Sequence, residues 1–122
     1  EFIMPIQIEE AKTPKGRRMM LAKVTGHVSM ADAEAMGKLL QPGQPYHRAL
    51  ILSIVDKSTD YHPDARRHFQ TFNNNFDRMA TVVSSVLLRA AINFMAKVGG
   101  TGDRMQMFAT EADAVSWLDG VA

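Results

Sequence analysis

Several features that would indicate a chemistry are missing from this sequence. It has no cysteine, which excludes disulfides, thiolate metal sites and a cysteine nucleophile. No G-x-S-x-G, Walker or G-x-G-x-x-G motif is present, and no nucleophile–base–acid set can be assembled from known motifs. A net charge of +1 is too small for a surface that tracks nucleic-acid phosphates. We therefore expect a non-enzymatic protein with no cofactor, no metal and no nucleic-acid partner.

The location of the protein is also constrained by absences. The N-terminus lacks the basic region and long apolar run of a signal peptide. The absence of cysteine suits a reducing compartment, so we expect a cytoplasmic protein. The stretch 78–100 has the length of a membrane span, but Arg89 lies at its middle and Lys97 near its end. A central arginine costs about 2.5–3.5 kcal/mol on insertion scales, so this stretch is interpreted as part of a soluble core.

The composition is that of a globular protein. Of 122 residues, 46% are hydrophobic and 22% charged, which suits one domain. Glu1, Phe2 and Ile3 precede Met4 and look like a cloning scar, so the domain is expected to span 4–122. The nine methionines are interpreted as pliable core residues; the alternative is an adaptable binding surface.

Alternation and apolar runs predict the strands. Residues 5–12 and 17–28 alternate and are joined by a Thr13–Gly16 turn, which predicts an antiparallel hairpin. Residues 48–55 form an almost continuous apolar run, typical of a central strand that is covered on both faces. Shorter strands are predicted at 79–83 and 104–109, and the polar stretch 56–62 is interpreted as a loop.

Capping residues and periodicity predict four helices. Ser29 with Asp32 forms a capping box before a helix that ends near Leu40. Pro63 opens a second helix, with Ala65, Phe69, Phe72 and Phe76 on one side. A third helix is predicted at 86–98, and Thr110 caps the last, whose apolar side comprises Ala112, Val115, Trp117 and Leu118. The result is an α/β fold with a mixed sheet of about five strands, in which a hairpin precedes alternating helices and strands.

These segments resemble a known family of small bacterial proteins, the SpoIIAA-like family, also called STAS/SEC14-like. The resemblance covers nearly the whole chain after Pro5 and is closest at the C-terminal end. The matching segments are Val24–Val28, Ala31–Leu40, Leu50–Asp56, Arg78–Val83, Arg104–Phe108 and Glu111–Leu118. Most of them are core positions, so the resemblance is more specific for fold than for activity.

The resemblance implies a regulatory or protein-interaction module, in some relatives controlled by phosphorylation of Ser or Thr. In anti-sigma-factor antagonists the phosphoacceptor directly follows a strand-terminal Asp at the start of a helix. Here Asp56 is followed by Ser58 and Thr59, but the next helix is predicted to start only at Pro63, so the motif is not intact. The SEC14-like name implies an alternative function, a small carrier for an apolar or lipid-like ligand.

Polar residues follow the predicted strands and mark a candidate interaction rim. The carboxyl ends of parallel strands meet at one edge, where ligands gather in open α/β sheets. The candidate phosphoacceptor or rim residues are Asp56, Ser58, Thr59, Ser84 and Ser85. Ordinary helix capping also explains such residues. His62, Asp64 and His68 are close in sequence, but their spacing matches no metal signature, and a hydrolase built on His62 is the least favoured function.

The predicted helix 86–98 carries more apolar surface than one sheet face requires. Its polar residues Arg89, Asn93 and Lys97 form a single narrow stripe. We therefore expect part of it to meet a ligand, another helix or a second copy of the chain, and we predict a homodimer. The candidate apolar ligand or dimer surface comprises Leu88, Ile92, Met95, Phe69 and Phe72.

Overall fold

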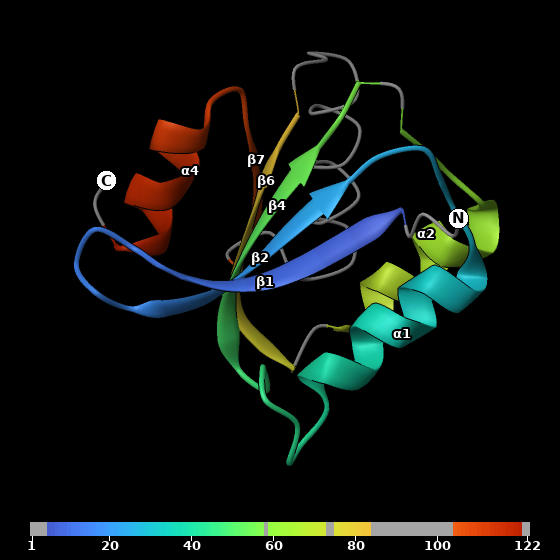
Figure 1. Cartoon of the computed structure of the whole chain (residues 1–122), viewed down its shortest axis with the longest axis horizontal. Coiled ribbons are helices and arrows are strands. Elements are labelled where there is room, and N and C mark those ends of the chain that lie inside the picture. The colour runs from blue at the N-terminus through green and yellow to red at the C-terminus, as the bar shows by residue number, and fades with distance from the viewer. Residues whose placement is uncertain (1–4, 58, 73–74, 84–103, 121–122) are drawn as a thin grey trace.

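The fold is a five-stranded mixed sheet with helices on both faces (Figure 1). The computed structural model describes residues 5–57, 59–72, 75–83 and 104–120. In the order β1-β2-β4-β6-β7, the sheet consists of β1 (Ile6–Lys12), β2 (Arg18–Val24), β4 (Ala49–Val55), β6 (Phe76–Val82) and β7 (Met105–Phe108). β1 and β2 form the predicted antiparallel hairpin, and β2, β4, β6 and β7 run parallel. The predicted α/β class and mixed sheet are therefore confirmed.

The helices divide between the two faces of the sheet. Figure 1 shows α1 (Met30–Leu40) and α2 (Pro63–Phe69) together on one side, and α4 (Glu111–Leu118) on the other. A short 3₁₀ turn, η1 (Gln70–Phe72), extends α2. The described part of the chain thus has three α-helices, and the helix predicted at 86–98 lies outside it.

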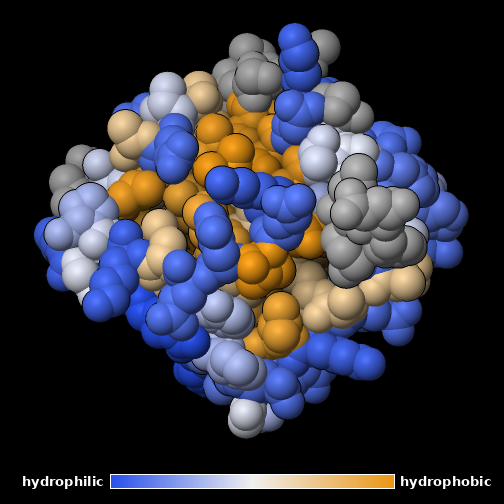
Figure 2. All heavy atoms as spheres, viewed as in Figure 1, coloured by the Kyte–Doolittle hydropathy of each residue, from blue (hydrophilic) through white to orange (hydrophobic). Residues whose placement is uncertain are grey.

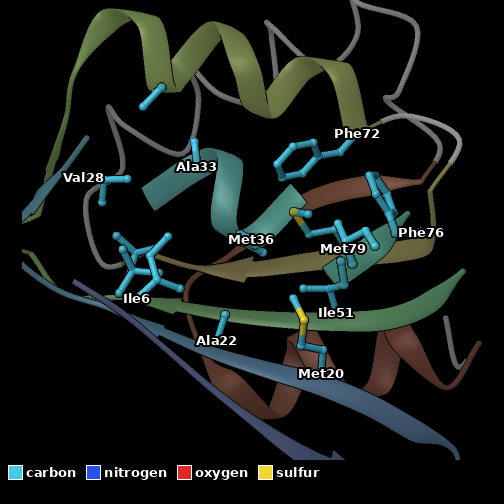
Figure 3. Packing of buried hydrophobic residues seen from close by; sticks show 14 of the residues in the cluster. Ile6, Met20, Ala22, Val28, Ala33, Met36, Ile51, Phe72, Phe76 and Met79 are labelled. Carbon is cyan, nitrogen blue, oxygen red and sulfur yellow. The ribbon is translucent and has the colours of Figure 1, made fainter. Parts of the chain in front are cut away.

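The face toward α1 and α2 carries the larger core (Figure 3). Side chains from alternate positions of β2 and the neighbouring strands point to the same face, as the pleat requires. They meet the buried stripe of α1 and the aromatic end of α2 and η1. The main members are Ile6, Met20, Ala22, Val24, Ala33, Met36, Leu40, Ile51, Ala65, Phe72, Phe76 and Met79. Because α1 presents Gly37 to the ring of Phe72, the two helices approach closely at this point.

The opposite face packs against α4. Met19, Leu50, Leu52 and Ala80 of the sheet are buried with Ala114 and Leu118 of the helix. Figure 2 shows hydrophobic surface over the middle of the molecule in the view of Figure 1, with hydrophilic side chains around it. Since β4 is buried on both faces, its near-continuous apolar sequence is explained.

Helix capping follows the sequence prediction. Asp32 N–H donates to Ser29 Oγ at 3.3 Å and Ser29 N–H donates to Asp32 Oδ2 at 2.9 Å, so the capping box is complete. Thr110 Oγ1 accepts from Asp113 N–H at 3.2 Å. At the other end of α4, Arg17 and Arg78 donate to the carbonyls of Leu118 and Trp117 at 2.9 and 2.8 Å. Cations there also complement the negative end of the helix dipole.

Several element boundaries differ from the prediction. The strand predicted at 17–28 ends at Val24, because Gly26 has a φ of +82° and turns the chain. Phe76 was wrongly placed on the second helix: it opens β6 and is buried in the core. On α4, Ala114 rather than Ala112 faces the sheet, and Ala112 is exposed.

Candidate functional site

A second, two-stranded sheet continues the main sheet at the carboxyl ends of β2 and β4. It consists of β3 (His27–Val28) and β5 (Asp60–Tyr61), which pair in parallel. The region 56–62, predicted as a loop, thus contains a strand. Asp56 and Thr59, two of the residues that we predicted for the rim, lie next to this sheet. We call it, with the residues that flank it from 24 to 28 and from 56 to 64, the rim sheet.

Backbone hydrogen bonds fix the rim sheet. The N–H groups of Asp56, Asp60 and His62 donate to the carbonyls of Val24, Gly26 and Val28 at 2.9, 3.0 and 2.9 Å. These bonds hold the two segments together as paired strands despite their shortness. Side chains on the rim sheet therefore project from a hydrogen-bonded backbone.

Two histidines and two carboxylates gather on its exposed side. His27 Nδ1 lies 3.1 Å from Asp60 Oδ1, and both side chains are more than half exposed. Because an ionised carboxylate only accepts hydrogen bonds, His27 carries its proton on Nδ1 in this contact. The rings of His27 and His62 meet edge to face, with centroids 6.4 Å apart.

His62 caps the second helix. It directly precedes α2, which begins at Pro63 as predicted, and its Nδ1 accepts from Asp64 N–H at 3.1 Å. Nδ1 of His62 is therefore unprotonated in this contact, the reverse of His27. The Asp64 carboxylate lies 3.8 Å from the same nitrogen and pairs with Arg67.

The histidines do not converge on a metal-binding position. His68 packs edge to face on Phe72, with centroids 5.5 Å apart, and so points into the α1–α2 contact. His62 and Asp64 lie at the exposed start of the helix instead. Within the described ranges, no group of three or more His, Asp or Glu side chains is arranged to hold a metal ion.

Thr59 is the one candidate phosphoacceptor that lies within the described residues. Its hydroxyl donates to the Val24 carbonyl at 3.1 Å, and its N–H donates to the Asp56 carbonyl at 3.0 Å. It is half-buried between β2 and β5, while Asp56 is exposed. Ser58, Ser84 and Ser85 lie outside the described residues.

Phe69 and Phe72 are the candidates for an apolar surface that the structure describes, and Phe69 contacts Tyr61 of the rim sheet. Phe69 contacts the rings of Tyr61 and Phe72 edge to face, at centroid distances of 5.8 and 5.3 Å. Burial raises the pKa of Tyr61 to about 12, and the positive charge of Arg66 opposes this only in part. These aromatics therefore join the rim sheet to the core. Leu88, Ile92 and Met95 lie outside the described residues, so an apolar ligand or dimer surface stays a prediction.

The rim sheet was missed by sequence reasoning because its strands are two residues long. Periodicity cannot be detected over so few positions. Val28 and Tyr61 could have indicated these strands. Both residues have high strand propensity, and each follows a polar residue near the end of a predicted strand.

Comparison with known proteins identifies the family. The family model described as SpoIIAA-like matches residues 19–119, which includes the sheet from β2 onward, the rim sheet and α4. The chain belongs to the SpoIIAA-like family. The resemblance seen in the sequence is thereby confirmed, and the SpoIIAA-like fold makes this a STAS-type module.

A solved structure agrees with this SpoIIAA-like assignment. It is the crystal structure of an uncharacterized DUF3478-family protein with a SpoIIAA-like fold from Shewanella loihica PV-4. The two chains are 19% identical, the match covers 97% of each, and the TM-score is 0.71. At this identity the likeness shows the fold alone. A search of curated proteins finds no match. No helix among the described residues is long and apolar enough to cross a membrane.

Proposed function

We propose that this SpoIIAA-like domain is a non-enzymatic interaction module that binds a partner protein through the rim sheet. The observation that supports this most directly is the β3–β5 pairing, which presents His27, Asp60, His62 and Asp64 side by side. A recognition surface gains affinity when its groups are held in place before binding, because less conformational entropy is lost.

The polar character of this surface favours a specific, polar contact. Imidazole and carboxylate groups alternate across the strand pair, so a partner must match both donors and acceptors. The carboxylates Asp56, Asp60 and Asp64 are all exposed, and Asp64 already pairs with Arg67. A positively charged group on the partner suits the exposed carboxylate of Asp60.

Site-specific photo-cross-linking tests the proposal. A photoreactive residue at position 27 or 60 should cross-link one partner in cells, and the same residue at Lys12 is the control. Lys12 pairs with Arg18 at the start of β2, so it lies at the other end of the sheet. Asp60→Lys should abolish the cross-link from position 27 and leave the circular dichroism spectrum unchanged. Equal cross-linking from Lys12, or no effect of Asp60→Lys, would contradict the proposal.

Regulation by phosphorylation of Ser58 or Thr59 is the finer part of this proposal. A phosphate carries about −1.5 to −2 charges at neutral pH and would stand beside Asp56 and Asp60. The Thr59 hydroxyl would also have to leave the Val24 carbonyl, which would loosen the rim sheet. Phosphopeptide mass spectrometry of native protein is the test, and the absence of modification on both residues would remove this part.

Self-association is proposed on the sequence of 86–98, whose apolar positions include Leu88, Ile92 and Met95. A homodimer in the cytoplasm would bury that surface. Light scattering should then give twice the mass of the chain, and a monomer at high protein concentration would refute the dimer.

A further inference from the structure

A charged hollow lies at the opposite end of the sheet from the rim. Arg48 directly precedes β4, Phe76 and Asp77 open β6, and Arg104 directly precedes β7. Because these three strands are neighbours and run parallel, their starting residues meet at one edge. Together these four residues line a hollow of about 350 Å³. This volume lies at the small end of the range of ligand sites in proteins.

The charged side chains of the described lining are mainly positive. Arg48 and Arg104 both line the hollow, and Asp77 is its acidic member among the described residues. The Asp77 carboxylate is already engaged, because Arg17 Nη2 donates to its Oδ2 at 3.4 Å. Two guanidinium groups of the described lining therefore face one carboxylate, which already pairs with Arg17 outside the lining, so an anion entering the hollow meets a net attraction.

Arg104 is held in position before any ligand arrives. Its Nη1 donates to the Phe76 carbonyl at 3.0 Å, and its guanidinium lies over the Phe76 ring, 5.3 Å from the centroid. Phe76 is itself buried in the core, at 3% exposure. A guanidinium has five N–H donors, so this anchoring leaves others for an anion.

Arg48 adopts a backbone conformation that arginine rarely takes. Its φ is +60°, in the left-handed region, and it is the one non-glycine residue with positive φ in the described ranges. Backbone hydrogen bonds surround it: Arg48 N–H donates to the Asn75 carbonyl at 2.8 Å, and Ala49 N–H to the Tyr46 carbonyl at 3.0 Å. Glycine or asparagine would fit this position with less strain. Strained residues of this kind cluster at functional sites.

We propose that this hollow binds the phosphate group of a small phosphate monoester, with Arg48 and Arg104 as the binding residues. Guanidinium groups bind phosphate oxygens through paired N–H donors. The charge of a phosphate monoester, about −1.5 to −2, matches two guanidiniums better than the single charge of a carboxylate. The site is independent of the rim sheet and of the partner proposed for it.

Titration of the ¹⁵N-labelled protein with inorganic phosphate, glycerol 3-phosphate and acetate tests the proposal by nuclear magnetic resonance. Both phosphates should shift the amide signals of Ala49, Asp77 and Met105 in a saturable manner, and acetate should bind more weakly. Tighter binding of glycerol 3-phosphate would show that the hollow also contacts the organic part of the ligand. Equal binding of the two phosphates would assign the site to free phosphate and overturn the monoester.

Arg48→Gly is the decisive variant, because glycine suits the φ of +60° and should leave the fold intact. Loss of one charge-assisted contact should weaken phosphate binding about tenfold or more. Arg48→Lys keeps the charge but loses the paired donors. The affinity of this variant for phosphate should therefore lie between that of the wild type and that of Arg48→Gly. Arg67→Ala, on exposed α2, is the matched control and should bind as the wild type does.

Three further results would overturn the proposal. The first is the absence of saturable shifts up to about 10 mM phosphate, a range that covers millimolar dissociation constants. The second is unchanged affinity in Arg48→Gly. The third is a set of shifts confined to the rim sheet, which would place the anion at the other end of the molecule.

Discussion

The contact between Gly37 of α1 and Phe72 of η1 leads to a sharp prediction about stability. A Cβ atom added at Gly37 would lie 2.9 Å from Phe72 Cε1 and 3.2 Å from Cζ. The ring cannot easily move away, because Phe72 is 3% exposed and is flanked by His68 and Phe69 at centroid distances of 5.5 and 5.3 Å. We therefore expect Gly37→Ala to strain the α1–α2 contact.

Two opposing effects set the magnitude. Replacing glycine with alanine inside a helix normally stabilises by about 0.8–1 kcal/mol. Overpacking a well-filled core costs about 1–3 kcal/mol. The net expectation is that Gly37→Ala lowers the free energy of unfolding by about 1 kcal/mol, or the melting temperature by about 4 °C.

Urea unfolding followed by circular dichroism measures this difference, with two variants as controls. Ala35→Gly, at an exposed position of the same helix, should cost about 1 kcal/mol and reports the helix propensity alone. In a Phe72→Leu background the obstructing ring is gone, so Gly37→Ala should become stabilising. The change of sign gives a coupling of about 2 kcal/mol between the two positions. If Gly37→Ala stabilises the wild-type protein by the full propensity gain, the close approach is refuted.

Three further predictions concern the cap of α1, the contacts of Arg78 and the burial of Tyr61. Ser29→Ala removes the capping box of α1 and should cost about 1 kcal/mol by urea unfolding, while Ser29→Thr, whose hydroxyl can still accept from Asp32 N–H and donate to the Asp32 carboxylate, should cost less. Arg78→Met removes the hydrogen bond to the Trp117 carbonyl and the contact of the guanidinium with the Trp117 ring at 5.1 Å. It should cost about 1–2 kcal/mol, and an unchanged midpoint would show that neither contact stabilises α4. Tyr61 has a folded-state pKa of about 12 against 10 in the unfolded chain. The contribution of its protonated form to the free energy of unfolding is therefore fully present below pH 10. Between pH 10 and 12 the unfolded state releases the proton first, and the free energy of unfolding should fall by about 1.4 kcal/mol per pH unit. This part of the pH dependence should be missing in Tyr61→Phe.

Local sequence determined those elements whose signals lie within a few residues. The capping box of Ser29 and Asp32, the turn between β1 and β2 and the start of α2 at Pro63 were all predictable, because caps, turns and proline act on their own backbone. The apolar run of β4 predicted a strand buried on both faces, since only such a strand needs apolar residues at every position. Residues 58, 84, 85, 88, 92 and 95 lie outside the described ranges, so the roles predicted for them stay predictions.

Only the tertiary structure decided which distant residues meet. The two-residue strands of the rim sheet exist because each supplies the other's hydrogen bonds, and neither has a local pattern of its own. Phe76 fits a helical period with Phe69 and Phe72, yet the core takes it into β6, because burial against neighbours outweighs periodicity at the end of an element. Arg48 and Arg104 are far apart along the chain and line one hollow only because of the parallel order β4-β6-β7. Sequence patterns thus determined which elements form, whereas strand pairing determined the rim sheet and the arginine hollow.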